Sequence, residues 1–283
     1  ALARAPGDPR ALELRGTVLL ARAVSAEDAA SGAGQVERAE RDLTAAVAAE
    51  PGLASAWSTL SQVLRYRGRF DESDAAARRA LAEDAYLDDA DDVLHRLYFG
   101  ALMTGDYAQA GTLCGEGRRR FRGDWRFVEC RLTLLREDRG APADPALALR
   151  LLAELDTLDP PARARREGRG YSPLFRKAVA AAILARAGRA DAARELLARA
   201  ERDAGRDAGL RLSLAYDEAY ARLLLGERDS ARALLGRTLA LRPELRPFAA
   251  RDPLLRELVG PAAADGATGT RPAAGGSPTR PRS

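Results

Sequence analysis

A repeating pattern of small and apolar residues is the feature of this sequence that most restricts its fold. Six times along the chain, a small residue is followed four positions later by an apolar one, at intervals of 34 to 45 residues. The six pairs are Ala39/Leu43, Ser73/Ala77, Ala110/Cys114, Ala148/Leu152, Ala193/Leu197 and Ala231/Leu235. A period in this range is typical of solenoids built from helical repeats. The pattern therefore predicts about six repeated units in one elongated array.

Each unit is expected to form two helices joined by a tight turn. Residues 54–67 show the apolar period of a helix through Trp57 and Leu64, and Gly68 supplies the left-handed residue that ends many helices. Phe70 then opens a second helix. Neither helix can bury its other face alone, so consecutive pairs must stack on one another. Composition agrees, because the apolar content is mostly Ala and Leu and only 5% of the residues are aromatic.

These units resemble the tetratricopeptide repeat (TPR) family. The family's first helix carries a signature of Trp, Leu, Gly and Tyr. In the second unit, Trp57 and Leu60 match the first two signature positions, whereas Ser61 and Leu64 depart from the Gly and the Tyr. Residues 68–73 and 105–110 resemble the family's turn between helices, and Gly16 and Pro51 resemble the Gly and Pro of a first repeat. The resemblance covers residues 9–243. It implies an all-α, right-handed α-solenoid of about six helix pairs with a short C-terminal capping helix.

Departures from the period predict the loops and the ends of the array. Residues 1–260 are expected to form the solenoid, and the irregular stretches predict inserted loops near 25–34, 138–144 and 161–172. Close to the end, the last repeat's apolar face is expected to be covered by Leu254, Leu255 and Leu258. Residues 261–283 are a mixture of Ala, Gly, Pro, Thr and Ser that cannot offset its ordering entropy, so we expect a disordered tail.

The sequence offers little for catalysis. His95 is the only histidine, which excludes multi-histidine metal sites and leaves one candidate base for a catalytic triad. Lys177 is the only lysine and does not follow a phosphate-binding glycine-rich loop. The acidic run 88–92 is not followed by the Gly and Glu of an EF-hand calcium loop, and we interpret it as a helix start favoured by the dipole. We therefore expect no catalytic residue, metal or cofactor, and no enzyme activity in this chain.

The resemblance also implies a partner-binding groove. In TPR arrays the first helix of each pair lines the concave surface, and its inward positions hold the ligand. Transferred residue by residue, these positions are Gln62, Arg65 and Tyr66, then His95, Phe99 and Met103, then Trp125 and Arg136, then Arg186, and finally Tyr216 and Tyr220. Aromatic residues and Arg dominate binding hot spots, although Phe99 and Trp125 are equally well explained as core between repeats. The family's carboxylate-clamp subtype needs Asn and Lys in the groove, and this sequence has no Asn.

Two functions agree with these features. The first is a non-catalytic scaffold that binds a peptide or protein partner in the concave groove. The second rests on a resemblance to the repeat regions that follow the catalytic domain of some bacterial serine/threonine kinases, carried by Pro243, residues 247–248 and residues 252–255. It implies a substrate-recruiting or sensory region whose catalytic domain lies upstream.

Charge and cysteine content restrict the class of partner and the compartment. The formal net charge is +4, and residues 261–283 contribute half of it, so the body lacks the positive field expected of a nucleic-acid-binding protein. No apolar run is long enough to cross a bilayer. Cys114 and Cys130 are too few for a disulfide scaffold and favour a reducing compartment, where they are expected to pack as small apolar side chains. A disulfide between them is the alternative, and it requires their Cα atoms to come within about 7 Å. We favour the cytoplasm, with the periplasm as the alternative if an export signal has been removed. The scarcity of Lys, Ile and Asn indicates a high-GC bacterial genome.

Overall fold

The computed structural model describes residues 7–25 and 29–259, and every regular element within those ranges is helical. The chain divides into two compact units, which we call unit 1 (residues 1–122) and unit 2 (residues 123–283). In each unit, consecutive helices pack in pairs, as the TPR-like prediction requires, so an all-α solenoid fold is confirmed. The repeat pattern predicted the pairs but not the division between the units.

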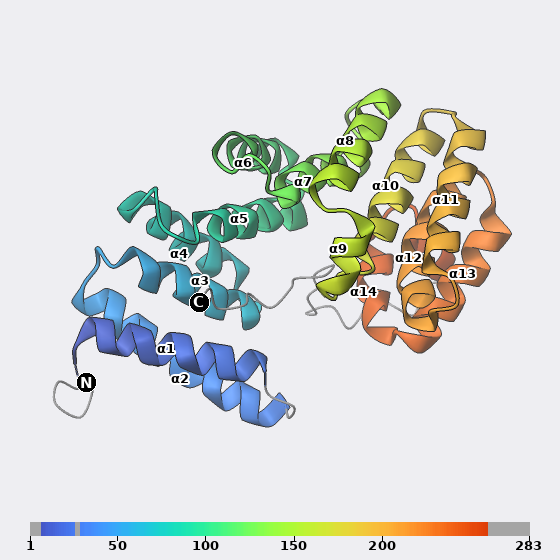
Figure 1. Ribbon diagram of the computed structural model, residues 1–283. Helices are drawn as coiled ribbons and strands as arrows, with labels where there is room; N and C mark the ends of the chain where they lie inside the picture. Colours follow the sequence, from blue (N-terminus) through green and yellow to red (C-terminus); the bar gives the residue numbers. More distant parts are fainter. Residues whose placement is uncertain (1–6, 26–28, 260–283) are drawn as a thin grey trace. The chain divides into compact units, whose positions relative to one another are not determined.

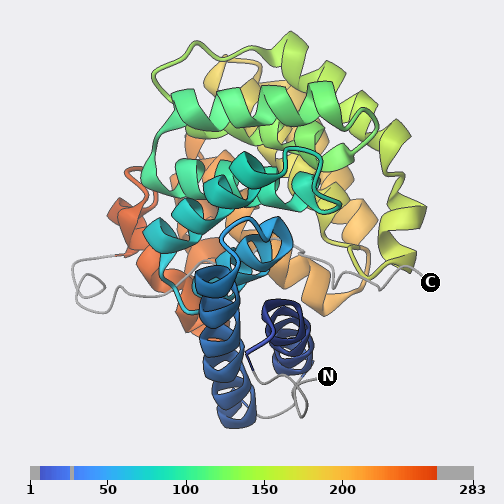
Figure 2. The same ribbon diagram turned by 90° about the vertical axis from the view of Figure 1, so that its left-hand side faces the viewer.

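The described residues of unit 1 form three helix pairs. They are α1 (Pro9–Val24) with α2 (Ala29–Ala49), α3 (Ala54–Tyr66) with α4 (Phe70–Glu83), and α5 (Ala90–Thr104) with α6 (Tyr107–Arg120). Two views show α1 and α2 lying side by side (Figure 1, Figure 2). Each pair contacts the next, α2 against α3 and α4 against α5, so that every pair covers apolar surface of its neighbour.

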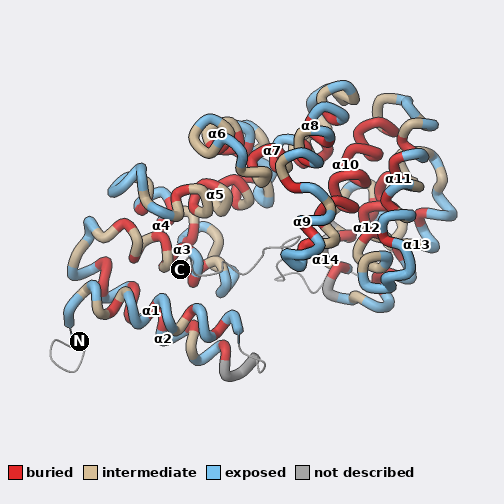
Figure 3. The backbone as a smooth tube through the Cα atoms, in the orientation of Figure 1, coloured by how far each residue is buried: buried red, intermediate tan, exposed pale blue. Residues whose placement is uncertain are grey.

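Up to residue 259, where the description ends, unit 2 also forms three pairs, with extra short helices. The pairs are α7 (Trp125–Glu137) with α8 (Pro145–Leu158), α10 (Ser172–Arg186) with α11 (Ala190–Ala204), and α12 (Ala208–Leu224) with α13 (Arg228–Leu241). The short elements are α9 (Pro161–Arg166), a 3-10 turn (Pro243–Leu245), α14 (Arg246–Arg251) and α15 (Arg256–Val259). Helix α10 is the centre of this unit, because it contacts α7, α8, α11 and α12 and is buried from Ser172 to Ala185 (Figure 3).

The turns within the pairs are built as the glycines predict. Gly68, Gly105, Gly188 and Gly226 all have positive φ, between 72° and 80°. Residues with a Cβ rarely adopt this left-handed conformation, so glycine at these positions ends one helix and lets the chain reverse into the next. The C-terminal cap also forms as expected, since Leu255 is fully buried and Leu254 and Leu258 pack on the core of unit 2.

Small residues allow the paired helices to approach closely. A Cβ added to Gly16 of α1 would lie 2.7 Å from Cγ of Leu43 and 3.3 Å from the carbonyl oxygen of Ala39, both in α2. In the next pair, Ser73 Oγ donates a hydrogen bond of 2.8 Å to the carbonyl oxygen of Ser61. The helix–helix distance therefore requires a residue without a side chain at Gly16, and the small Ser73 of the repeat lies within hydrogen-bond distance of the backbone of its partner helix.

The Gly16→Ala variant should accordingly be less stable than the wild type. Leu43 is fully buried and cannot swing away from the new methyl group, so overpacking should outweigh the gain in helix propensity and cost about 1–2 kcal/mol. Gly111→Ala in α6 is the matched control, because a Cβ there meets nothing within 4 Å, and it should be neutral or stabilising. Denaturant unfolding followed by circular dichroism measures both; equal stability of the two variants would contradict the argument.

The predicted loops are only partly correct. Helix α2 begins at Ala29, so residues 29–34 are helical and the loop expected at 25–34 is wrong there; buried Gly32 and Val36 extend the contact side of the helix toward α1. Residues 138–144 contain no helix, whereas the stretch 161–172 includes α9. The tail expected at 261–283 lies outside the described residues.

Both cysteines are buried, as expected of small apolar side chains, with Cys114 and Cys130 each 2% exposed. Neither is a free thiol, however, which does not agree with the reducing compartment that their small number favoured. Their apolar surroundings were predictable from the repeat, whereas their oxidation state was not.

Candidate functional site

In unit 1 the candidate groove residues lie on neighbouring faces of α3 and α5. Gln62, Arg65 and Tyr66 are spaced three and four residues apart, so they share one face of α3. His95, Phe99 and Met103 follow one another at intervals of four residues and share one face of α5. We call this set of six residues the α3–α5 face.

A cation–π contact joins the two halves of the α3–α5 face. The guanidinium carbon of Arg65 lies 4.4 Å from the centroid of the Phe99 ring, and Arg65 donates a 3.5 Å hydrogen bond to the carbonyl oxygen of Arg96. Burial and the nearby charge of Arg96 lower the pKa of Arg65, and Asp74 opposes this shift. The contact fixes a planar cation against an aromatic ring at the centre of the face.

A polar cluster that the sequence analysis missed supports this face from one end. Ser58 Oγ donates a 2.5 Å hydrogen bond to Asp89, and Arg96 donates a 2.7 Å hydrogen bond to the same Ser58 oxygen. Burial lowers the pKa of Arg96, with the carboxylate of Asp89 acting against it. Asp89 occupies the N-cap position of α5, as the acidic run suggested, but its side chain does not cap the helix. Ser58 and Arg96 are 38 residues apart in the sequence, so no local sequence pattern predicts that they form a hydrogen bond.

The outer part of the α3–α5 face is accessible. Tyr66 is 58% exposed and Met103 is 43% exposed, and Gln62 is also exposed. Phe99 and His95 are half-buried, and the His95 ring lies 5.8 Å from that of Tyr98. A phenol, a thioether and an amide therefore surround the Arg65–Phe99 contact, an arrangement that offers both apolar contact and hydrogen bonding to a peptide.

In unit 2 the candidate residues are engaged in interactions within the unit. Trp125 is half-buried and contacts two guanidinium groups, with Arg169 at 4.6 Å and Arg176 at 4.7 Å from its ring centroid. Both cations bind the carboxylate of Asp159, at 2.6 and 2.8 Å. Trp125 is thus part of a buried cluster that ties α7 to α10 and to the linker after α8. The position of Trp125 therefore agrees with the alternative given for it in the sequence analysis, which is core packing rather than a place in the groove.

Arg136 and Tyr220 form a second internal cluster. Arg136 is 6% exposed and donates a 2.9 Å hydrogen bond to Asp217, and its guanidinium lies 5.5 Å from the Tyr220 ring. Tyr220 is 5% exposed and its hydroxyl accepts a 3.1 Å hydrogen bond from Arg139. Burial raises the pKa of Tyr220, although Arg136 and Arg139 oppose the shift.

The two remaining candidates in unit 2 are also in contact with the unit itself. Arg186 donates hydrogen bonds to the carbonyl oxygens at the end of α7, including Leu135 at 2.8 Å and Asp138 at 3.3 Å. A cation at that position stabilises carbonyl groups that have no partner in the helix. Tyr216 is half-buried against the core of unit 2.

The described residues contain no group of three His, Cys, Asp or Glu side chains that could hold a metal ion. None of the helices within residues 7–25 and 29–259 is long and apolar enough to cross a membrane.

Comparison with known proteins supports the fold alone. No protein-family model and no curated protein matches the sequence. Among solved structures, the chain resembles one from the crystal structure of the APC/C hetero-tetramer Cut9–Hcn1, with a TM-score of 0.57 and 14% sequence identity. The match covers 91% of this chain and 43% of that chain, so this chain spans less than half the length of its structural neighbour. The neighbour is built of TPR repeats, which agrees with the helix pairs described above.

Proposed function

We propose that this chain is a non-catalytic interaction scaffold that binds a peptide or protein partner on the α3–α5 face of unit 1. The observation that carries the proposal is the exposed pair Tyr66 and Met103, which flanks the Arg65–Phe99 cation–π contact. Large exposed side chains next to a fixed cation and ring are typical of protein-binding hot spots. Since Arg65 and Phe99 are already held together, binding would cost little side-chain entropy at the centre of the face.

The candidate residues of unit 2 contribute less to this proposal. Arg136 and Tyr220 are buried and already paired, so a ligand could reach them only by displacing internal partners. Breaking such contacts costs more than a surface hydrogen bond returns. We therefore assign these residues to the architecture of unit 2 and place recognition on unit 1.

The test compares the partners captured by the wild type and by a Tyr66→Ala/Met103→Ala double variant. Immobilised full-length chain is incubated with lysate of the source cells, and captured proteins are quantified by mass spectrometry. Loss of two hot-spot side chains should reduce recovery of a specific partner by about tenfold or more. The control is Tyr86→Ala/Leu149→Ala, which removes a 91% exposed tyrosine and a 45% exposed leucine from other surfaces. Equal recovery by both variants and the wild type would refute the assignment to the α3–α5 face.

A further inference from the structure

Arg65, at the centre of the α3–α5 face, has no carboxylate partner. Among the described residues it forms no ion pair, and its only hydrogen bond there is the 3.5 Å contact from Nη1 to the carbonyl oxygen of Arg96. Nε and Nη2 form the other edge of the guanidinium group; they have no partner in that part of the chain and are not buried. The donors of this edge are therefore open to a ligand.

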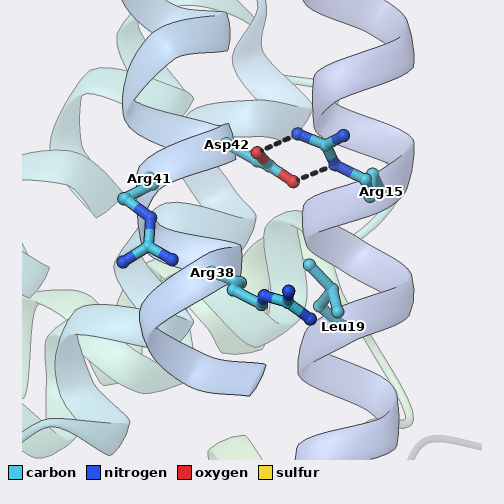
Figure 4. Close-up of a pocket in the computed structure, with 5 residues that line it drawn as sticks. All are labelled: Arg15, Leu19, Arg38, Arg41 and Asp42. Carbon is cyan, nitrogen blue, oxygen red and sulfur yellow. Dashed lines mark hydrogen bonds and ion pairs between the residues drawn. The ribbon is translucent and has the colours of Figure 1, made fainter. Parts of the chain in front are cut away.

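A hollow between α1 and α2 shows how such an edge binds a carboxylate in this chain. The hollow has a volume of about 350 Å³, and Arg15 and Asp42 are among its lining residues. Arg15 donates from Nε and from Nη2 to the two oxygens of Asp42, each at 2.5 Å (Figure 4). The planar guanidinium group matches a carboxylate through these two parallel hydrogen bonds. Arg65 presents the same pair of donors, so a carboxylate on a ligand would complete an equivalent pair.

The Phe99 ring distinguishes Arg65 from an arginine that only extends into solvent. The guanidinium carbon of Arg65 lies 4.4 Å from the centroid of this ring, so α5 fixes the position of a cation that α3 supplies. Since the cation is held before a ligand arrives, little side-chain entropy is lost when a carboxylate binds to it. A fixed pair of donors also selects a ligand by geometry as well as by charge.

The charges around Arg65 leave its own charge uncompensated. Besides burial, the positive charge of Arg96 lowers the pKa of Arg65, and Asp74, the carboxylate that opposes this shift, has a smaller effect. Asp74 is held against α5, because a Cβ added to Gly100 would lie 2.5 Å from its Oδ2 atom. The carboxylate of Asp89 lies 3.7 Å from Arg96 and compensates that cation instead. A negatively charged ligand group at Arg65 is therefore favoured and a positively charged one is disfavoured.

Apolar side chains flank the open edge on the same side of the two helices. Tyr66 and Met103 are 37 residues apart, as are the turn glycines Gly68 and Gly105, so the two side chains occupy equivalent positions in consecutive repeats. Equivalent positions of stacked repeats point in the same direction. Tyr66 is 58% exposed and Met103 is 43% exposed. One ligand can therefore contact both of them and the cation that joins α3 to α5.

We propose that the partner peptide carries an aspartate or glutamate whose side chain binds Nε and Nη2 of Arg65, an assignment that rests on the function proposed for the α3–α5 face. Apolar residues beside this acid contact Tyr66 and Met103. A terminal carboxylate is a poorer match, because the chain has no Asn and its single lysine, Lys177, lies in unit 2. Phosphate recognition uses clusters of arginines, whereas this edge belongs to one.

The probe is a library of random peptides of about 12 residues, long enough in extended form to cross both helices. They are displayed with the C-terminus fused to a phage coat protein, so no free terminal carboxylate is present. Selection on the immobilised full-length chain should enrich peptides with Asp or Glu at one fixed position beside apolar residues. Selection on Arg65→Gln should lose this acidic position. The control Arg119→Gln, at an exposed position of α6, should keep it.

A double-mutant cycle then tests direct contact between Arg65 and the acid. Fluorescence anisotropy measures binding of the consensus peptide, amidated at its C-terminus, and of a counterpart with Asn or Gln in place of the acid. Arg65→Gln and the change in the peptide should each weaken binding about tenfold, and both together should weaken it no further. A purely structural effect of Arg65→Gln would weaken the two peptides equally. Raising the salt concentration from about 0.05 to 0.5 M should weaken only the acidic peptide appreciably.

Failure of this assignment can be told apart from failure of the proposed function. Selected peptides that lose binding in Tyr66→Ala/Met103→Ala but have no acidic position would leave the proposed function standing and refute the role of Arg65. Additive weakening in the cycle would also refute it. Binding about tenfold tighter with phosphoserine in place of the acid would identify a phosphate ligand instead. If no selected peptide depends on Tyr66 and Met103, the proposed function fails and the role of Arg65 fails with it.

Discussion

Replacing Asp159 with alanine is expected to destabilise unit 2 by about 3–5 kcal/mol. The Asp159 side chain is fully buried and accepts hydrogen bonds of 2.6 and 2.7 Å from Arg169 and one of 2.8 Å from Arg176. Arg176 is itself fully buried, and Arg169 is 4% exposed. Without the carboxylate, two guanidinium groups would remain in the interior with only part of their charge compensated. Uncompensated buried charge is among the costliest consequences of a single substitution.

Denaturant unfolding followed by circular dichroism measures this effect, with Glu167→Ala as the matched control. Glu167 also binds Arg169, at 2.6 Å, but its side chain is 45% exposed. Water can replace an exposed carboxylate, so the control should change stability by no more than about 0.5 kcal/mol. A loss of less than about 1 kcal/mol in Asp159→Ala would show that the cluster is not held by this carboxylate.

The contacts of Asp159 with Arg169 and Arg176 also make its contribution to stability depend on pH. Burial alone would raise the pKa of Asp159, but hydrogen bonds and positive charge from Arg169 and Arg176 outweigh it and hold the pKa below its ordinary value. For a carboxyl group with a lowered folded pKa, the stabilisation is complete above its unfolded pKa of about 3.9 and is lost as the pH falls through the folded value. The difference in stability between wild type and Asp159→Ala should therefore shrink when unfolding is repeated below about pH 4.

Local features of the sequence were sufficient to predict the helix pairs. The left-handed glycines such as Gly68, and the small residues such as Gly16, have roles that depend on neighbours within the same pair. The start of α2 was mispredicted because the run from Ser31 to Gly34 is unfavourable for a helix by propensity alone, whereas contact with α1 extends the helix through it. Tertiary packing overrides propensity where a helix has a partner along its whole length.

The candidate site was predictable only as positions, not as environments. Helical spacing alone places Gln62, Arg65 and Tyr66 on one face of α3, because spacing of three and four residues is a local property. The partners of Trp125 could not be predicted, because Arg176 is 51 positions away in the sequence and the linker that carries Arg169 follows no repeat. An arginine that binds a ligand and one that neutralises a buried carboxylate look the same in a sequence. The two kinds of arginine differ in whether the fold brings a carboxylate from a distant part of the sequence close to the guanidinium group.

Arg136 makes this difference measurable, because it was a groove candidate by position and is a buried ion-pair partner in the structure. Its guanidinium bonds Asp217 at 2.9 Å and Glu137 at 2.8 Å, and lies 5.4 Å from the Phe175 ring. Burial alone would lower its pKa, but the charges of Glu137 and Asp217 raise it instead. Arg136→Ala should therefore cost about 3–5 kcal/mol, since it removes the cation that Arg136 supplies to Asp217, a carboxylate that is 2% exposed.

Arg131→Ala is the matched control for this substitution, because Arg131 lies on the same helix and is exposed. It should change the free energy of unfolding by less than about 0.5 kcal/mol. If Arg136→Ala proved as stable as this control, Arg136 would contribute little to the core, and its assignment to the architecture of unit 2 would be wrong. If it is strongly destabilised, any loss of partner binding by this variant reflects the loss of folded unit 2. Binding defects then become informative only for exposed positions such as Tyr66 and Met103, where the side chain can be removed without opening the core.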